Sequence, residues 1–167
     1  MGMTRGNDQY KKTRMEQGMT IEELEKRVRT LEDMEEIKEL HREYLFLISG
    51  IEMEKALDCF TGDIEVEVAN YGVRKGKEEV GRFFREIIGP NVLSSKDGHL
   101  TGQPVIAIEG EKARGHWMFY RFVHDQSRRW IQGRYDCEYI KENGKWKFSM
   151  LKMRRPWPAF LGDAPES

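Results

Sequence analysis

The chain has 167 residues, which is enough for one domain built around a single hydrophobic core. It carries 28 Lys and Arg against 29 Asp and Glu, and this near-balance argues against a dedicated nucleic-acid-binding protein, because phosphate contacts need a basic excess. The sequence has no apolar run near the ~20 residues of a membrane-spanning helix, no apolar segment typical of a secretory signal, and only two cysteines. We therefore expect a cytoplasmic protein that binds neither nucleic acid nor membranes.

The N-terminal region, residues 1–19, is polar and lacks sustained periodicity, so we expect a flexible tail before one domain at residues 20–167. Thr20 and Glu23 have the capping-box spacing that begins a helix. The first apolar residues of this helix follow at 3-4-3 spacing: Ile21, Leu24, Val28 and Leu31. So narrow a stripe predicts packing against a partner helix, and its length leaves ordinary helix packing and a coiled coil both open.

The apolar run YLFLIS from Tyr44 predicts a buried end to this helix, which Gly50 terminates. A short helix at 52–60 and a turn at 61–63 follow. Alternation of apolar and acidic residues then predicts a half-buried strand through Ile64, Val66 and Val68.

A third helix begins after Gly76, and the Gly89-Pro90 pair is predicted to end it. Its apolar face is formed by Val80, Phe83, Phe84 and Ile87. The rest of the chain predicts strands at 98–101, 104–109, 113–124, 130–142 and 146–153, with Asn143-Gly144 as a hairpin turn. Helices followed by an antiparallel meander predict an α+β fold with helices packed on one face of a curved sheet.

Aromatic residues crowd the predicted strands, and alternation along 113–124 places apolar side chains on both faces of the sheet. Trp117 and Phe119 share one face with Arg121, whereas the other face carries Met118, Tyr120 and Phe122. A single domain must bury both faces, so we expect one to close over helices and a pocket and the other to meet a second copy. The sequence thus predicts a homo-oligomer, a dimer or trimer, formed through the sheet face, with the N-terminal helix as a second contact.

Four motifs in this order resemble the SnoaL-like families of the nuclear-transport-factor-2-like superfamily. They are the helix IKELHREYLFLISG, the GKEEVGRFF helix, the strand pair GHLTGQPVIAIEGEKARGHW and the closing GRYDCEYIKENGKWKF, and the resemblance spans residues 20–156. It implies a cone-shaped α+β barrel enclosing a hydrophobic small molecule. Characterised enzymes of these families, bile-acid 7-alpha-dehydratase, scytalone dehydratase and lindane dehydrochlorinase, are cofactor-free lyases with a His as general base, so the resemblance implies no cofactor.

The resemblance assigns catalytic roles to Tyr44, His99 and Arg155, which match active-site positions of the bile-acid enzyme. Two family aspartates are replaced, by Ser49 five residues after the tyrosine and by Arg121 on the long strand. We expect substrate contacts from four residues of the resulting pocket: Arg121, Ser49, Trp117 and Phe119.

His99 suits the role of base because an ordinary histidine has a pKa near 6.5. Tyr44 can supply the proton for a leaving hydroxyl, and Arg155 or Arg121 can stabilise developing enolate charge. The plainer alternatives are that His99 caps a loop at a strand end and that Tyr44 is a core residue of an amphipathic helix.

Arg121 in the pocket would disfavour protonation of His99 and favour an anionic ligand, or else pair with an acid such as Glu138. Asp125 and Asp136 are the candidates to replace the missing carboxylate behind His99.

No metal site is expected, because His116 and His124 lie roughly 26 Å apart along one strand. Cys59 and Cys137 fit the pattern of small buried residues.

The sequence supports two functions. One is a cofactor-independent lyase (dehydratase) or isomerase acting on a bulky hydrophobic substrate such as a steroid or polyketide, with His99 as general base. The other is a non-catalytic module of the same fold that binds a small molecule or supports assembly.

Overall fold

The computed structural model of the chain describes residues 19–95, 98–124 and 128–157. Of the tail predicted at residues 1–19, residues 1–18 lie outside the described residues. The chain divides into two units, residues 1–32 and residues 33–167, and the sheet and the hydrophobic core belong to the second unit. None of the helices in the described segments combines the length and the apolar character needed to cross a bilayer.

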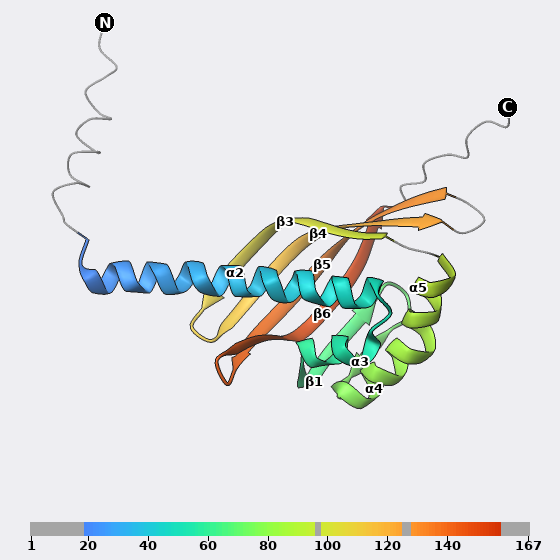
Figure 1. Cartoon of the computed structure of the whole chain (residues 1–167), viewed down its shortest axis with the longest axis horizontal. Helices are drawn as coiled ribbons and strands as arrows, with labels where there is room; N and C mark the ends of the chain where they lie inside the picture. Colours follow the sequence, from blue (N-terminus) through green and yellow to red (C-terminus); the bar gives the residue numbers. More distant parts are fainter. Residues whose placement is uncertain (1–18, 96–97, 125–127, 158–167) are drawn as a thin grey trace, which may run out of the picture. The chain divides into compact units, whose positions relative to one another are not determined.

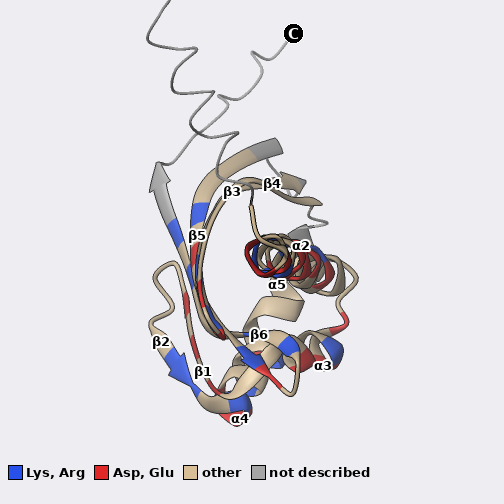
Figure 2. Ribbon diagram, turned by 90° about the vertical axis from the view of Figure 1, so that its left-hand side faces the viewer, with Lys and Arg blue, Asp and Glu red and all other residues tan. Residues whose placement is uncertain are grey.

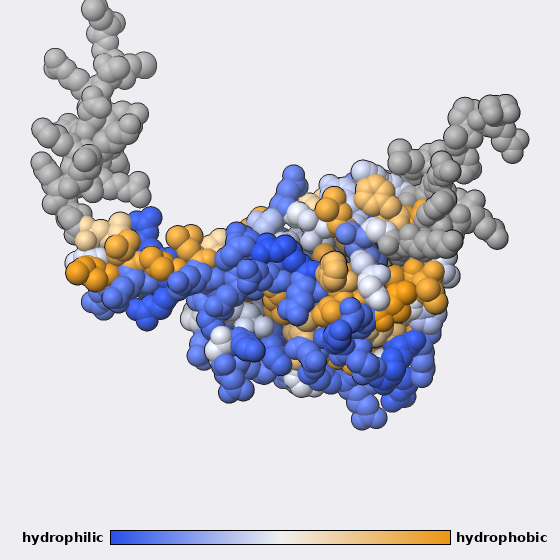
Figure 3. Space-filling model, in the orientation of Figure 1, coloured by the Kyte–Doolittle hydropathy of each residue, from blue (hydrophilic) through white to orange (hydrophobic). Residues whose placement is uncertain are grey.

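Helix α2 (Ile21–Ser49) begins as the capping box predicts. The backbone N–H of Thr20 donates to Oε2 of Glu23 at 2.9 Å, and the N–H of Glu23 donates to Oγ1 of Thr20 at 3.1 Å. The apolar residues of its first half are exposed, and Figure 3 shows an apolar strip along this part of the helix.

A Schellman motif ends α2. The N–H of Ile51 donates to the carbonyl of Ile48 at 3.1 Å, and the N–H of Glu52 donates to the carbonyl of Leu47 at 2.9 Å. Gly50 is the capping residue, as predicted, but the left-handed conformation falls on Ile51, with φ of 62°. The motif thus places a β-branched residue where glycine is usual.

The end of α2 is not buried all round as predicted. Tyr44, Leu45 and Ile48 are buried, whereas 77% of Phe46 is exposed. The reason is that only one side of the helix meets the sheet, and residue 46 lies about 160° around the helix from residue 48.

After α2 come the short helix α3 (Met53–Ala56), the 3-10 turn η1 (Leu57–Cys59) and strand β1 (Phe60–Val68). The short strand β2 (Val73–Lys75) follows, and it was not predicted from the sequence. The turn predicted at 61–63 is wrong, because these residues lie inside β1. The register of β1 against the last strand shifts between Phe60 and Glu65, so the turn-like sequence Thr-Gly-Asp forms an irregularity within a strand.

Helix α4 (Gly76–Phe83) continues into a π-helical turn, η2 (Phe84–Ile88), and then into α5 (Gly89–Ser95). Gly89-Pro90 therefore does not end the helical segment, because proline is tolerated at the first turn of a helix. The wider π turn also changes the apolar face: Ile87 is 37% exposed, and Ile88 packs on the core in its place.

The sheet is completed by β3 (Gly98–Glu109), β4 (Lys112–His124), β5 (Arg128–Glu142) and β6 (Lys145–Trp157). The strand order is β2-β1-β6-β5-β4-β3, and every neighbouring pair is antiparallel except β1 and β6. The two strands predicted at 98–101 and 104–109 are one strand with a register shift between Gly102 and Val105. Asn143 and Gly144 form the predicted hairpin turn, with φ of 51° and 77°.

The result is the predicted α+β fold, in which helices pack against a curved mixed sheet. The sheet does not close into a full barrel, because β2 and β3 remain as its two edges. Figures 1 and 2 show β3, β4 and β5 curving around helices that lie on the concave side. Asp33 of α2 accepts hydrogen bonds from Lys141 at 2.6 Å and from Trp146 at 2.9 Å, which ties the helix to the β5–β6 hairpin.

The outer, convex face of the sheet is apolar only in part. An aromatic cluster forms where the ring of Phe122 lies 4.4 Å from Trp130 and that of Tyr120 lies 5.8 Å from it. Further along the same face, Asp136 is surrounded by cations instead: it pairs with Arg134 at 2.8 Å and with Arg154 at 3.1 Å. The prediction of an apolar second face therefore holds near Phe122 and fails around Asp136.

Candidate functional site

A small cavity of about 50 Å³ lies between the concave face of the sheet and the helices. Most of its lining is apolar or aromatic, and a few polar side chains enter it from separate elements. The lining residues are Tyr44, Ile48, Val68, Phe84, Ile88, Asn91, Val92, His99, Phe119, Arg121, Tyr135 and Met153. An apolar cavity with a few convergent polar groups has the character of a small-molecule site.

His99 and Arg121 enter this cavity side by side. They are directly opposed in the antiparallel β3–β4 pair, and alternation places both on the concave face. Phe119, two residues from Arg121 on the same face, stacks against the His99 ring with centroids 5.7 Å apart. The strand register thus brings together an imidazole, a guanidinium and an aromatic wall.

Ser49, at the last turn of α2, contacts His99. Its Oγ lies 3.2 Å from Nδ1 of His99. The position at which the family resemblance expects an aspartate therefore does face the histidine, and in this chain it presents a hydroxyl in place of a carboxylate.

Two phenols, Tyr44 from α2 and Tyr135 from β5, line the cavity and are both buried. Burial raises the pKa of Tyr44 well above its ordinary value. Burial likewise raises the pKa of Tyr135, although the charge of Arg121 acts in the opposite direction. Both phenols therefore remain protonated near neutral pH and are suited to donate a hydrogen bond, and only a strong base such as a departing hydroxide can take their proton.

The structure thus unites His99, Tyr44, Arg121 and Phe119 in one cavity. Trp117 lies outside the lining, since it is a core residue that stacks on His41 with centroids 4.1 Å apart and donates its indole N–H to Tyr139 at 2.8 Å. The side chain of Arg155 lies outside the described part of the chain.

Two of the acids proposed as partners for the site, Asp136 and Glu138, lie elsewhere. Asp136 is on the outer face, where Nδ1 of His116 approaches its carboxylate to 2.6 Å. Glu138 forms an ion pair with Arg114 at 3.5 Å instead of with Arg121. Asp125 is not among the described residues. Of the described residues that line the cavity, none is Asp or Glu.

Tyr135 and Asn91 were missed from the sequence. Alternation along β5 could have found Tyr135, because Cys137 and Tyr139 occupy the same buried face. Asn91 gave no comparable signal, because the helical continuation past Pro90 that brings it to the cavity was not predicted; its side chain donates to the hydroxyl of Tyr71 at 3.2 Å.

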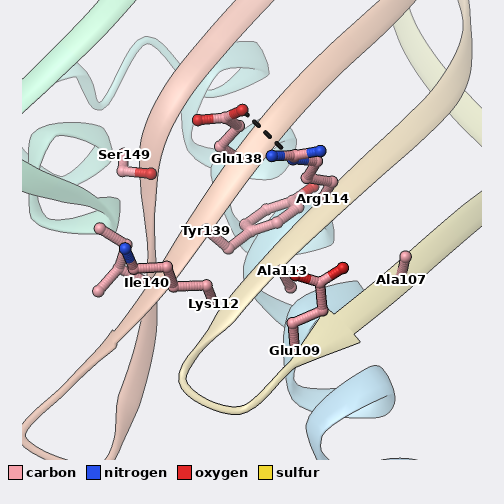
Figure 4. A pocket seen from close by; sticks show the side chains of 9 residues that line it. All are labelled: Ala107, Glu109, Lys112, Ala113, Arg114, Glu138, Tyr139, Ile140 and Ser149. Carbon is pink, nitrogen blue, oxygen red and sulfur yellow. Dashed lines mark ion pairs between the residues drawn. The ribbon is translucent and has the colours of Figure 1, made fainter.

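A larger hollow of about 270 Å³ lies on the other face of the sheet, near the β3–β4 turn (Figure 4). Its wall mixes both charges, and the Arg114–Glu138 ion pair crosses one side of it. The rest of the lining is Ala107, Glu109, Lys112, Ala113, Tyr139, Ile140 and Ser149. None of the predicted site residues contributes to this hollow.

The described segments contain no cluster of three or more His, Cys, Asp or Glu side chains that could hold a metal ion. Both cysteines are buried, and burial raises the pKa of the Cys59 thiol to about 12 and that of Cys137 further. Thiols held in the protonated form are poor nucleophiles.

Comparison with known proteins agrees with this architecture. The sequence matches the SnoaL-like domain over residues 29–152. A search of the curated proteins finds no match.

Solved structures with the same fold are numerous. A hexachlorocyclohexane dehydrochlorinase, LinA-type3, from Novosphingobium barchaimii superimposes with a TM-score of 0.71 at 18% identity, covering 83% of this chain and 96% of that one. A scytalone dehydratase-like protein from Novosphingobium aromaticivorans gives a TM-score of 0.68 at 19% identity, covering 81% and 93%. An NTF2-like protein with a cystatin-like fold from the same species gives 0.70 at 20% identity, covering 89% and 94%. At these identities the similarity establishes the fold.

Proposed function

Since the chain belongs to the SnoaL-like domain family, we propose that it is a cofactor-independent lyase or isomerase that acts on a hydrophobic substrate with His99 as general base. The observation that carries the proposal is the convergence of His99, Tyr44 and Arg121 on one apolar cavity. The fold similarity supports elimination as the type of reaction, since two structural neighbours are named as a dehydrochlorinase and as scytalone dehydratase-like.

In the proposed elimination, the imidazole of His99 removes a proton from a carbon next to the leaving group. The electron pair of that C–H bond becomes the new C=C bond, and the bond to the leaving group breaks. A departing hydroxide takes a proton from a cavity phenol, Tyr44 or Tyr135, and leaves as water, whereas a departing chloride needs none. Arg121 stabilises negative charge that develops on a carbonyl or on the leaving group.

The substrate must be small or must widen the cavity. About 50 Å³ is well below the ~300–1,000 Å³ typical of ligand pockets. A steroid or polyketide of the size first expected enters only if lining side chains such as Ile88 and Val92 move. A compact halogenated or hydroxylated ring requires less movement of these side chains.

We would test the proposal with hexachlorocyclohexane and scytalone, following chloride release and the absorbance of the dehydrated product. The expected result is turnover of at least one probe, with loss of about 10²–10⁴-fold in His99→Ala. His116→Ala is the matched control, because that histidine lies on the outer face, and it should keep full activity. Equal activity in His99→Ala and the intact chain would overturn the role of the base.

A second candidate function is non-catalytic binding of an anionic hydrophobic ligand. It is favoured by the guanidinium of Arg121, which lines the apolar cavity directly across the strand pair from His99. Calorimetry with carboxylate-bearing aromatic probes would distinguish it. Saturable binding without turnover, weakened in Arg121→Ala and unchanged in Arg114→Ala, would favour this reading over the lyase.

A further inference from the structure

The first half of α2 carries an apolar strip whose side chains are exposed in the single chain. The exposed fractions are 78% for Ile21, 53% for Leu24, 43% for Val28 and 65% for Leu31. The strip ends there, because the next positions in the same series are Glu35 and Lys38, which form an ion pair with each other at 3.2 Å. Four apolar residues in eleven positions, all exposed, form a surface that is usually covered by a partner.

The spacing of these residues follows the heptad repeat. Ile21 and Val28 occupy the a positions, and Leu24 and Leu31 occupy the d positions. In coiled coils, β-branched residues at a combined with leucine at d favour a parallel pair of helices over trimers and tetramers. For parallel helices, this order of side chains therefore favours two helices over three or four.

Charges beside the strip agree with the same arrangement. In a parallel pair, the g residue of one helix faces the e residue of the next heptad in its partner. These positions are Arg27 at g and Glu32 at e, so two symmetry-related attractive pairs, Arg27 to the partner's Glu32, would flank the apolar seam. The outermost f position holds Lys26, as expected for the side that faces solvent.

We propose that residues 21–31 form a parallel two-stranded coiled coil with a second copy of this chain. The helix does not depend on this contact to form, because α2 is capped at Thr20 and continues without interruption into the core-packed half that ends at Ser49. None of residues 21–31 lines the cavity, so this proposal does not depend on the proposed chemistry.

Cysteine cross-linking of the full chain tests the direction and the partner together. Parallel pairing places each d residue opposite its own copy, so Leu24→Cys should form a disulfide-linked dimer under mild oxidation. Lys26→Cys, on the opposite side of the same helix turn, is the matched control and should not. The native Cys59 and Cys137 are buried and contribute little background.

Sedimentation equilibrium supplies the second measurement. Leu24→Glu with Leu31→Glu should raise the dissociation constant of self-association at least about a hundredfold while leaving the far-ultraviolet circular dichroism of the domain unchanged. Arg27→Glu should weaken association by roughly fivefold, and adding Glu32→Arg should restore it.

Three outcomes would overturn the proposal. Equal cross-linking of Leu24→Cys and Lys26→Cys would show that the strip is not a seam. Cross-linking that requires Leu24→Cys and Val28→Cys together would indicate antiparallel pairing. An unchanged dissociation constant in Leu24→Glu with Leu31→Glu would place self-association elsewhere, and the strip would then cover a different partner.

Discussion

Ser49 and His99 illustrate how one side chain can set the strength of a base. A hydroxyl at 3.2 Å from Nδ1 can orient the imidazole, but unlike a carboxylate it carries no charge to stabilise the protonated ring. Ser49, which stands where the family resemblance expects an aspartate, therefore contacts His99 through a neutral hydroxyl instead of a carboxylate.

Restoring the carboxylate should strengthen the base. In Ser49→Asp the new charge lies beside His99, so we expect turnover of a responsive probe to increase about tenfold and the pH midpoint of activity to move upward. Steady-state rates between pH 5 and pH 9 measure both effects. Ser49→Asn, which keeps the size without the charge, is the control, and an equal gain in that variant would contradict the electrostatic explanation.

His41 is a second residue with a measurable consequence, this time for stability. It is fully buried against Trp117, its Nδ1 lies 3.4 Å from the Tyr139 hydroxyl, and its Nε2 has no hydrogen-bond partner among the described residues. Burial lowers the pKa of His41 to about 3. The folded protein therefore holds this imidazole neutral at pH values where the unfolded chain protonates it.

The expected pH dependence follows from that difference. Below pH 6.5, the ordinary value, the unfolded state binds a proton that the folded state does not, so the free energy of unfolding should fall by about 1.4 kcal/mol per pH unit as pH drops toward 3. His41→Phe should flatten the slope between pH 6 and pH 4, as measured by urea denaturation. The same slope in His41→Phe and in the intact chain would refute the assignment. His116→Gln is the control, because the side chain of His116 is exposed, and this variant should keep the slope of the intact chain.

At the scale of elements, the end of α2 contains avoidable strain. Ile51 adopts the left-handed conformation required by the Schellman motif, and a β-branched side chain is disfavoured there. Ile51→Gly should raise the free energy of unfolding by about 0.5–1 kcal/mol, because it relieves the strain at a position that is 39% exposed. Ile51→Val retains the β-branch and should give no gain in stability. Thermal denaturation compares the two variants, and an equal change in melting temperature in both would contradict the explanation by strain.

Elements with a strong local signal were predictable from the sequence. The capping box at Thr20 and the Asn143-Gly144 turn were located to the residue, because each depends on backbone groups a few positions apart. The turn predicted at 61–63 and the helix end predicted at Gly89-Pro90 were wrong, since pairing of β1 with β6 and the π turn at η2 overrode the local preference. No local pattern encodes such long-range constraints.

The same distinction applies to the candidate site. Alternation along β4 placed Phe119 and Arg121 on one face correctly, and the resemblance selected His99 and Tyr44, which the structure brings to the same cavity. The acids were assigned wrongly where a local signal existed: the alternation that buries Tyr135, Cys137 and Tyr139 puts Asp136 and Glu138 on the opposite face of β5, away from His99.

At the scale of the whole molecule, we propose that the aromatic end of the outer sheet face also supports self-association. Phe122 is 45% exposed beside Trp130 in a cluster that projects away from the core. Phe122→Glu should weaken self-association at least tenfold in sedimentation equilibrium. Lys112→Glu, at the far end of the same strand and on the same face, is the control, and equal effects of the two variants would assign the weakening to charge alone.

The parallel pairing of β1 with β6 also has a consequence for how the chain acquires its structure. β1 is the first strand of the sheet to be synthesised, yet β6, the strand that must lie beside it, is the last strand of the described sheet. Until then β1 lacks the strand with which Glu65 to Val68 pair, and closing so long a loop is slow. The sheet therefore reaches its native form only after β6 has been synthesised, and truncation before Lys145 should leave an incompletely folded chain that binds chaperones.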